Sequence, residues 1–358
     1  MDGQGSGARI SFRNDYSEGA HPRLLQAVAQ ASAEQHAGYG IDRLSARAVE
    51  LIRTAVAQPH ADVHLLVGGT QTNLIAISAF LRPHQAVIAV EAGHIATHET
   101  GAIEATGHKV LTVPALHDKL TPALIAPVLE VHSNEHMVQP RLVYISDSTE
   151  SGTIYTHAEL DALSRFCRAN DLLLYLDGAR LGAALTANGN DLDLPTIAAL
   201  TDAFYIGGTK NGALLGEALV IVNPALQADL RYLIKQRGAL LAKGMVLGSQ
   251  FAALFEDGLF FELAAHANAM AQRLRAGLLA AGAQFTSDSP TNQQFIAVSA
   301  QHTTQLAQRY DFERWEVRAD GSHVIRFVTS WATTPEAVDR LCADVAALLR
   351  DPAVQGHD

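Results

Sequence analysis

Residues 204–212 read FYIGGTKNG, and the chain is organised around this stretch. An apolar run typical of the end of a strand is followed by two glycines, a threonine and Lys210. A lysine forms a Schiff base only when its amine is neutral, so Lys210 would need a partly dry pocket that lowers its pKa. Taken alone the stretch is weak evidence, because most lysines in loops are solvated surface charges.

A second stretch upstream gives the lysine a partner. Residues 172–180 read LLLYLDGAR, an apolar run of strand length that ends in Asp177. Strands of parallel sheets are apolar on both faces, and ligands bind at their carboxyl ends. Pyridoxal phosphate needs a carboxylate that keeps its pyridine nitrogen protonated and a lysine that holds its aldehyde. Asp177 and Lys210, at the ends of successive strands, therefore predict a pyridoxal-phosphate site.

Composition and charge narrow the class of protein. The 358 residues are 48% hydrophobic, enough for one large core and a smaller second domain. The formal net charge of −11 argues against nucleic acid and anionic membranes as partners, since both require a basic surface. No apolar run has the length of a membrane span, and residues 1–7 lack the apolar core of a signal peptide. Cys167 and Cys342 are expected to be free thiols, which favours a cytoplasmic location.

The alternation of patterns along the chain predicts its organisation. An N-terminal helical segment is expected over residues 1–60, where Leu, Ala, Val and Ile recur at helical spacing. Over residues 61–245 short apolar runs alternate with helical patterns, which predicts a large α/β domain with a mainly parallel sheet. Residues 246–358 are expected to form linking helices and a small α+β domain, because the alternation stops there.

Two further motifs follow predicted strands. GGTQTN, residues 68–73, joins a strand to a helix, where glycines and free N–H groups can receive a phosphate. The alternative is an ordinary helix start capped by Thr70. His94 and His98 are spaced like a metal-binding pair on one helix face, although no third ligand stands out. The alternative is that His94, as a flat imidazole at a strand end, stacks on an aromatic ring.

Together these motifs resemble the threonine aldolases, in the β-eliminating lyase group of fold-type-I pyridoxal-phosphate enzymes. The resemblance covers nearly the whole chain. It is carried by FRND (12–15), YG (39–40), GTQ (69–71), His94 with Glu99, DGAR (177–180), TK (209–210) and VIRFVT (324–329). Within the group, STESGTIYT (148–156), TKNG (209–212) and RFVTSWATT (326–334) are most similar to the phenylserine-aldolase branch.

The resemblance implies a fold and an activity. The expected fold is α/β, fold-type-I transferase-like, with a mainly parallel seven-stranded sheet and a smaller C-terminal α+β domain. The expected activity is a carbon–carbon lyase reaction. It would cleave an amino acid of the L-threonine, L-allo-threonine or L-phenylserine type into glycine and an aldehyde by a retro-aldol step. A homodimer or homotetramer with sites at the dimer interface is also implied.

The resemblance assigns roles to individual residues. Cofactor binding falls to Lys210 (Schiff base), Asp177 (pyridine nitrogen), His94 (ring stacking), Gly69, Thr70 and Gln71 (phosphate), Thr209, and Lys243, which would reach the phosphate of a neighbouring subunit. Substrate binding falls to Arg180, Arg326 and Asn14, the last at a position where these enzymes commonly carry a serine. His136 would lie near the substrate hydroxyl, and His94, His136 or a water that they hold would act as the base. No metal is expected.

Other interpretations remain open on the residues alone. Without the resemblance, Arg180 is more simply a helix-start residue paired to a carboxylate, and Arg326 a surface charge on a strand edge. The same cofactor could support β-elimination or transamination, because no separate motif selects the bond that breaks. A pyridoxal-binding protein without turnover and a metal-dependent hydrolase that uses His94 and His98 are the alternatives from other classes.

Overall fold

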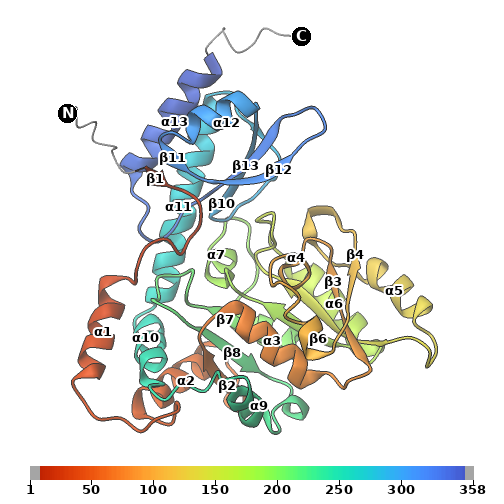
Figure 1. Ribbon diagram of the computed structural model, residues 1–358. Helices are drawn as coiled ribbons and strands as arrows, with labels where there is room; N and C mark the ends of the chain where they lie inside the picture. Colours follow the sequence, from red (N-terminus) through yellow and green to blue (C-terminus); the bar gives the residue numbers. More distant parts are fainter. Residues whose placement is uncertain (1–8, 351–358) are drawn as a thin grey trace.

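The computed structural model describes residues 9–350 and is built around a seven-stranded sheet of order β2-β8-β7-β6-β5-β3-β4 (Figure 1). Its strands are β2 (Asp62–Leu66), β3 (Gln85–Val90), β4 (Val110–Val113), β5 (Gln139–Ser146), β6 (Leu173–Asp177), β7 (Ala203–Gly207) and β8 (Glu217–Ile221). Only β8 runs against its neighbours, pairing antiparallel with both β7 and β2. The predicted α/β class with a mainly parallel sheet is confirmed.

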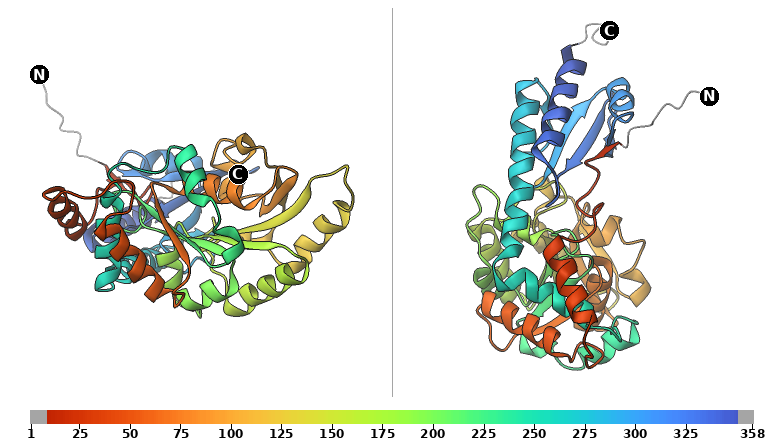
Figure 2. Two further views of the ribbon diagram at one scale, coloured as in Figure 1. Left: turned by 90° about the horizontal axis from the view of Figure 1, so that it is seen from below. Right: turned by 90° about the vertical axis from the view of Figure 1, so that its left-hand side faces the viewer.

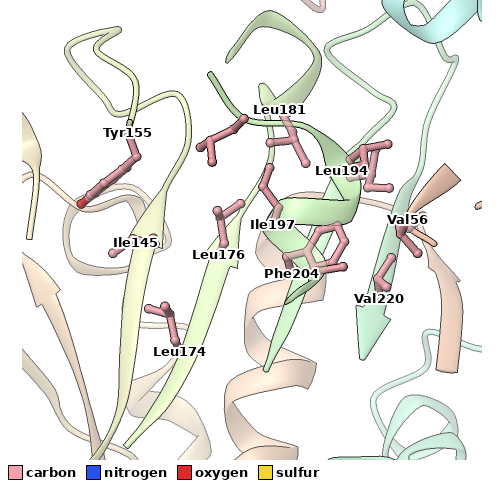
Figure 3. Close-up of a cluster of buried hydrophobic side chains, with 14 of the residues drawn as sticks. Val56, Ile145, Tyr155, Leu174, Leu176, Leu181, Leu194, Ile197, Phe204 and Val220 are labelled. Atoms are coloured by element: carbon pink, nitrogen blue, oxygen red, sulfur yellow. The ribbon is translucent and has the colours of Figure 1, made fainter. Parts of the chain in front are cut away.

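Both faces of the sheet are buried, which explains the uninterrupted apolar runs. Leu174, Leu176 and Phe204 point into one core (Figure 3). Tyr175 and Tyr205, one residue along their strands, point into the core on the other face. Alternate side chains of a strand lie on opposite faces, so a strand covered on both sides must be apolar at every position.

Helices cover the two faces. One face carries α3 (Gly69–Phe80) and α9 (Leu230–Gln236). The other carries α2 (Arg43–Ala55), α5 (Pro122–Val131), α6 (His157–Ala169), α8 (Leu194–Leu200) and α10 (Met245–Glu256). Helix α1 (Pro22–Ser32) packs beside α10, and the short helices α4 (His94–Thr97) and α7 (Leu181–Leu185) follow β3 and β6.

The C-terminal part is a separate, smaller layer. Helix α11 (Leu259–Ala280) runs from the large sheet into it (Figure 2, right). An antiparallel sheet of order β12-β13-β10-β9 packs there against α11 and α13. Its elements are β9 (Gln284–Phe285), β10 (Gln293–Val298), β12 (Glu313–Val317), β13 (His323–Val328), α12 (Ala300–Leu306) and α13 (Pro335–Arg350).

The N-terminal segment is shared between the two parts. Strand β1 (Ile10–Ser11) pairs with β11 (Tyr310–Asp311) beside the small sheet, whereas α1 and α2 pack against α10 beside the large one. The boundaries at residues 60 and 245 stay a prediction.

Two smaller expectations concern cysteines and membranes. Cys167 and Cys342 are free, as predicted, with Cys167 buried under the large sheet. Within residues 9–350 no helix combines the length and apolarity needed to cross a bilayer. The expectation about residues 1–7 lies outside the described residues.

Candidate active site

The carboxyl ends of the central strands meet at one edge of the large sheet, where they surround a cavity of about 380 Å³. Most of the predicted site residues line it: Gly69, Thr70, His94, Asp177, Arg180, Thr209 and Lys210. Thr70 at the start of α3 and Asp177 at the end of β6 thus share one site although they are far apart in the sequence, because parallel strands end at the same edge of a sheet.

Asp177 is held as a carboxylate. It is buried, and its Oδ2 accepts hydrogen bonds from Asn73 Nδ2 at 2.9 Å and from the Tyr144 hydroxyl at 2.5 Å. Its Oδ1 accepts from the Ala179 backbone N–H at 3.0 Å. Burial alone would raise the pKa of Asp177, but nearby His94 and these donors hold the pKa below its ordinary value. A buried, ionised carboxylate of this kind can keep a pyridine nitrogen protonated.

The same network continues to His94. Asn73 Nδ2 also donates to Glu99 Oε1 at 2.7 Å, and that oxygen lies 2.7 Å from His94 Nδ1. Burial disfavours the charged imidazole, but the Glu99 hydrogen bond and the charge of Asp177 raise the pKa of His94 overall. An Nδ1–H directed at Glu99 leaves Nε2 free to accept a proton.

Lys210 is presented by a tight reversal between β7 and β8. The backbone N–H groups of Gly208 and Thr209 both donate to Gly216 O at 3.0 Å, which returns the chain into β8. Burial and the nearby Arg180 guanidinium lower the pKa of the Lys210 amine, despite the opposing charges of Asp15 and Asp177. A lowered pKa is what a lysine requires in order to form a Schiff base.

The start of α3 fits a phosphate. Gly68 precedes the helix in an extended conformation, and no side chain caps the first turn, so the alternative of a Thr70 cap is wrong. The uncapped N–H groups and the helix dipole favour an anion there. A Cβ on Gly69 would come within 3.0 Å of the Tyr205 hydroxyl, so a larger residue would crowd this cradle. Gln71 does not line the cavity; its Oε1 accepts from Val67 N–H at 3.3 Å instead.

Arg180 and Arg326 differ in the partners that their guanidinium groups contact. Arg180 forms a two-pronged ion pair with buried Asp15, through Nε at 2.7 Å and Nη2 at 3.1 Å, so the local reading of Arg180 as a carboxylate partner is confirmed. Arg326 is buried, so it is not a surface charge. Its Nη1 donates to Gln293 Oε1 at 3.1 Å, and its Nε has no hydrogen-bond partner within residues 9–350. Asp15, not recognised from the sequence, forms an ion pair with Arg180, whereas no carboxylate among the described residues forms one with Arg326.

Besides Gln71 and Arg326, three further predicted residues do not line this cavity. Asn14 Oδ1 is engaged by Tyr16 N–H at 3.0 Å and by the Ser17 hydroxyl at 2.9 Å. His136 is exposed in the loop that enters the amino end of β5, the opposite end of the strand from the site. Lys243 is exposed in the loop before α10. Their roles stay predictions.

Sequence reasoning missed several functional residues. Asn73 and Glu99 lie inside quoted motifs, whereas Tyr144 reads as an ordinary core residue of β5. Glu217 also lines the cavity, and its Oε2 accepts from Gly208 N–H at 3.1 Å. Burial raises the pKa of Glu217 to about 8, although its Thr209 hydrogen bond and Lys210 oppose the shift. No signal in the sequence separates this glutamate from a surface residue.

His94 and His98 form a ring stack rather than a chelate. Their ring centroids are 5.5 Å apart with planes inclined by 18°. In the part of the chain that the structure describes, no three His, Cys, Asp or Glu side chains come together in a way that could hold a metal ion.

The fold and the site together define a fold-type-I pyridoxal-phosphate enzyme. A single mutant of the Thermus thermophilus aspartate aminotransferase shares the fold, with a TM-score of 0.72 at 15% identity over 95% of this chain and 91% of that one. The β-eliminating lyase family matches residues 12–301. The chain belongs to this family.

Relatives with higher sequence identity than this aminotransferase are named threonine aldolases. A low specificity L-threonine aldolase from a Pseudomonas species is 34% identical over 346 residues, 94% of this chain and 97% of that protein. The one from Pseudomonas aeruginosa is 32% identical over 342 residues, with the same coverage. A solved structure of a Leishmania major threonine aldolase has a TM-score of 0.94 at 51% identity, over 95% of this chain and 99% of that one. The predicted class, a carbon–carbon lyase, is confirmed.

Proposed function

We propose that the protein cleaves L-β-hydroxy-α-amino acids, of the threonine, allo-threonine or phenylserine type, into glycine and an aldehyde by a retro-aldol reaction. The observation that carries the proposal is a pair of adjoining cavities that share Lys210, whose pKa is lowered. One of them holds the ionised Asp177, and the other is lined by Arg326, whose Nε has no hydrogen-bond partner among the described residues. The names of the relatives support the same activity.

The residues present fit pyridoxal phosphate. Lys210 would hold the aldehyde, Asp177 the pyridine nitrogen, and the N–H groups of Gly69 and Thr70 the phosphate. When bound, the cofactor supplies an electron sink for the bond that breaks at the substrate Cα. Everything else in the reaction depends on how the chain orients the substrate and moves protons.

Orientation is assigned to the arginines. The Arg326 guanidinium, whose Nε has no partner in the described part of the chain, matches the two oxygens of an α-carboxylate. Arg180 faces the same space while Asp15 holds its other side. Fixing the carboxylate sets which bond at Cα stands perpendicular to the cofactor ring, and only that bond reacts.

Proton transfer from the β-hydroxyl is assigned to His94. Glu99 binds Nδ1 and thereby directs Nε2 toward the cavity that His94 lines. A histidine whose pKa lies above 6.5 still exchanges protons near neutral pH.

We also propose a homodimer or homotetramer. An apolar patch formed by exposed Tyr39, Ile41 and Tyr232 and half-buried Leu240 surrounds a shallow pocket, and Lys243 lies in the loop that continues from Leu240. A second copy on this patch would bury it and bring Lys243 toward another site. The two free thiols support a cytoplasmic location.

The direct test uses purified protein with added pyridoxal phosphate, L-threonine and DL-threo-phenylserine. We expect a visible absorbance band that Lys210→Ala alters, together with glycine and acetaldehyde or benzaldehyde. A band without aldehyde would move the assignment to β-elimination or transamination. Absence of any band would overturn the cofactor assignment as well.

A further inference from the structure

A second compartment of about 460 Å³ adjoins the cofactor cavity. The two share His94, Arg180 and Lys210, so a molecule bound at Lys210 can extend from one into the other. A volume of this size is typical of a small-molecule site. A methyl group, the β-substituent of threonine, would leave most of it to water.

Aromatic rings form the far side of this compartment. The Trp315 indole stacks on His98, with centroids 6.1 Å apart and planes inclined by 15°, and His98 in turn stacks on His94. Tyr16 lies on the near side, its ring centroid 6.0 Å from Lys210 Nζ. The stack therefore bridges the two parts of the fold, since His94 and His98 follow β3 and Trp315 belongs to β12.

Trp315 is aimed into the compartment by a local irregularity. The register of β12 against β13 shifts between Arg314 and Glu316, so Trp315 has no opposite residue. A bulge of this kind re-aims a side chain at the edge of a sheet. The Arg326 guanidinium lies 4.6 Å from the indole centroid, which places the aromatic wall beside the arginine assigned to the substrate carboxylate.

We propose that Trp315 and His98 form a subsite for an aryl β-substituent, so that the enzyme favours β-aryl-β-hydroxy-α-amino acids over threonine. This inference rests on the proposed function. A flat aromatic wall lowers the free energy of a bound substrate most when the substituent is itself a ring that can pack against it. A phenyl ring on the β-carbon offers a flat face that can pack against Trp315 and His98 in this compartment, whereas a methyl group offers none.

Steady-state kinetics test the subsite through the ratio of kcat/KM for an aryl substrate to kcat/KM for threonine. For Trp315→Ala we expect the ratio of kcat/KM for L-threo-phenylserine to that for L-threonine to fall about 10-fold, within the range that hydrophobic pockets provide. Trp315→Phe should keep most of the ratio, because a ring remains. The matched control is Trp331→Phe, which removes the other tryptophan of the chain, placed edge-on to His21 and outside the compartment. An equal loss for both substrates, or no change in the ratio, would overturn the subsite.

A binding measurement with amino acids that cannot be cleaved tests the subsite without turnover. In Trp331→Phe the only tryptophan left is Trp315, so its fluorescence reports on the compartment. L-Phenylalanine, which lacks a hydroxyl group to cleave, should change this emission, whereas L-alanine should leave it unchanged. If neither substrate is cleaved but L-phenylalanine still changes the emission, the proposed reaction fails and the subsite stands. If both amino acids act alike, the subsite fails.

Discussion

The two walls of the active site are built in opposite ways. The cofactor wall (Asn73, Glu99, Tyr144 and Asp177) comes from the large sheet, α3 and the loop after α4, and its charge is already surrounded by hydrogen bonds. The substrate wall (Gln293, Trp315 and Arg326) comes from the small sheet and contains a buried guanidinium nitrogen that has no hydrogen-bond partner among residues 9–350. A resident cofactor needs a prearranged electrostatic environment, whereas a substrate that comes and goes supplies the missing charge itself.

Lys210→Ala gives the largest expected effect, because both walls serve this amine. We expect aldehyde release to fall by at least ~10³-fold, since the covalent link and the associated proton transfers are lost together. The measurement is benzaldehyde formation from phenylserine, and Lys109→Ala, at an exposed lysine before β4, is the control. A variant that kept a tenth of the activity would remove Lys210 from its role.

Asp177→Asn tests the cofactor wall. It keeps the size of the side chain but removes the charge, and we expect kcat to fall roughly 10²–10³-fold, as when preorganised electrostatic groups are removed. The absorbance spectrum of the bound cofactor should change with it.

The matched control is Asp147→Asn, one residue beyond β5 at the same edge of the sheet but outside both compartments. Equal losses in the two variants would mean that the charge of Asp177 has no special role.

Arg326 and Arg180 test whether an arginine left for the substrate and an arginine paired within the protein have different effects on activity and stability. Each hydrogen bond to a charged group contributes about 1.5–3 kcal/mol, so Arg326→Gln should raise KM roughly 10- to 150-fold. It should cost little unfolding free energy, because no ion pair is lost. Arg180→Gln should instead destabilise the fold by about 3–5 kcal/mol, since it strands the buried Asp15 carboxylate.

Urea unfolding and steady-state kinetics on the same two variants separate these effects. The contrast fails if Arg326→Gln unfolds as readily as Arg180→Gln, or if KM is unchanged in both.

The smallest expected effect is a pH dependence of the unfolding free energy that comes from Asp147, one residue beyond the end of β5. Asp147 is buried with Oδ1 unpartnered among the described residues, and burial raises its pKa to about 8. The folded state then binds more protons than the unfolded state between about pH 4 and pH 8, so stability falls as pH rises through this window. The slope is at most about 1.4 kcal/mol per pH unit for each such group.

In the cofactor-free protein Glu217 should also lower the stability of the folded state as pH rises, because its pKa is likewise raised to about 8. Unfolding midpoints measured between pH 5 and pH 8 should therefore drop in wild type and flatten partly in Asp147→Asn. Identical pH dependence in the two proteins would show that Asp147 ionises freely in the folded state.

Local sequence patterns predict much of the architecture. The strand ending at Asp177 and the glycine-flanked Lys210 were predicted because strand length, apolarity and turn chemistry are properties of neighbouring residues. Strand β12 was missed, because ERWEV is charged, lies at a sheet edge and has no alternating apolar face. Trp315 and its subsite were missed with it.

The fold class, the cofactor and the place of Lys210 and Asp177 at one sheet edge follow from local sequence patterns. The tertiary structure alone decided which polar groups meet. Asn73 lies 104 positions from Asp177, and Asp15 lies 165 positions from Arg180. Whether a buried charge is paired depends on distances of a few ångströms between such remote residues, and that pairing sets both its pKa and its freedom to bind a substrate.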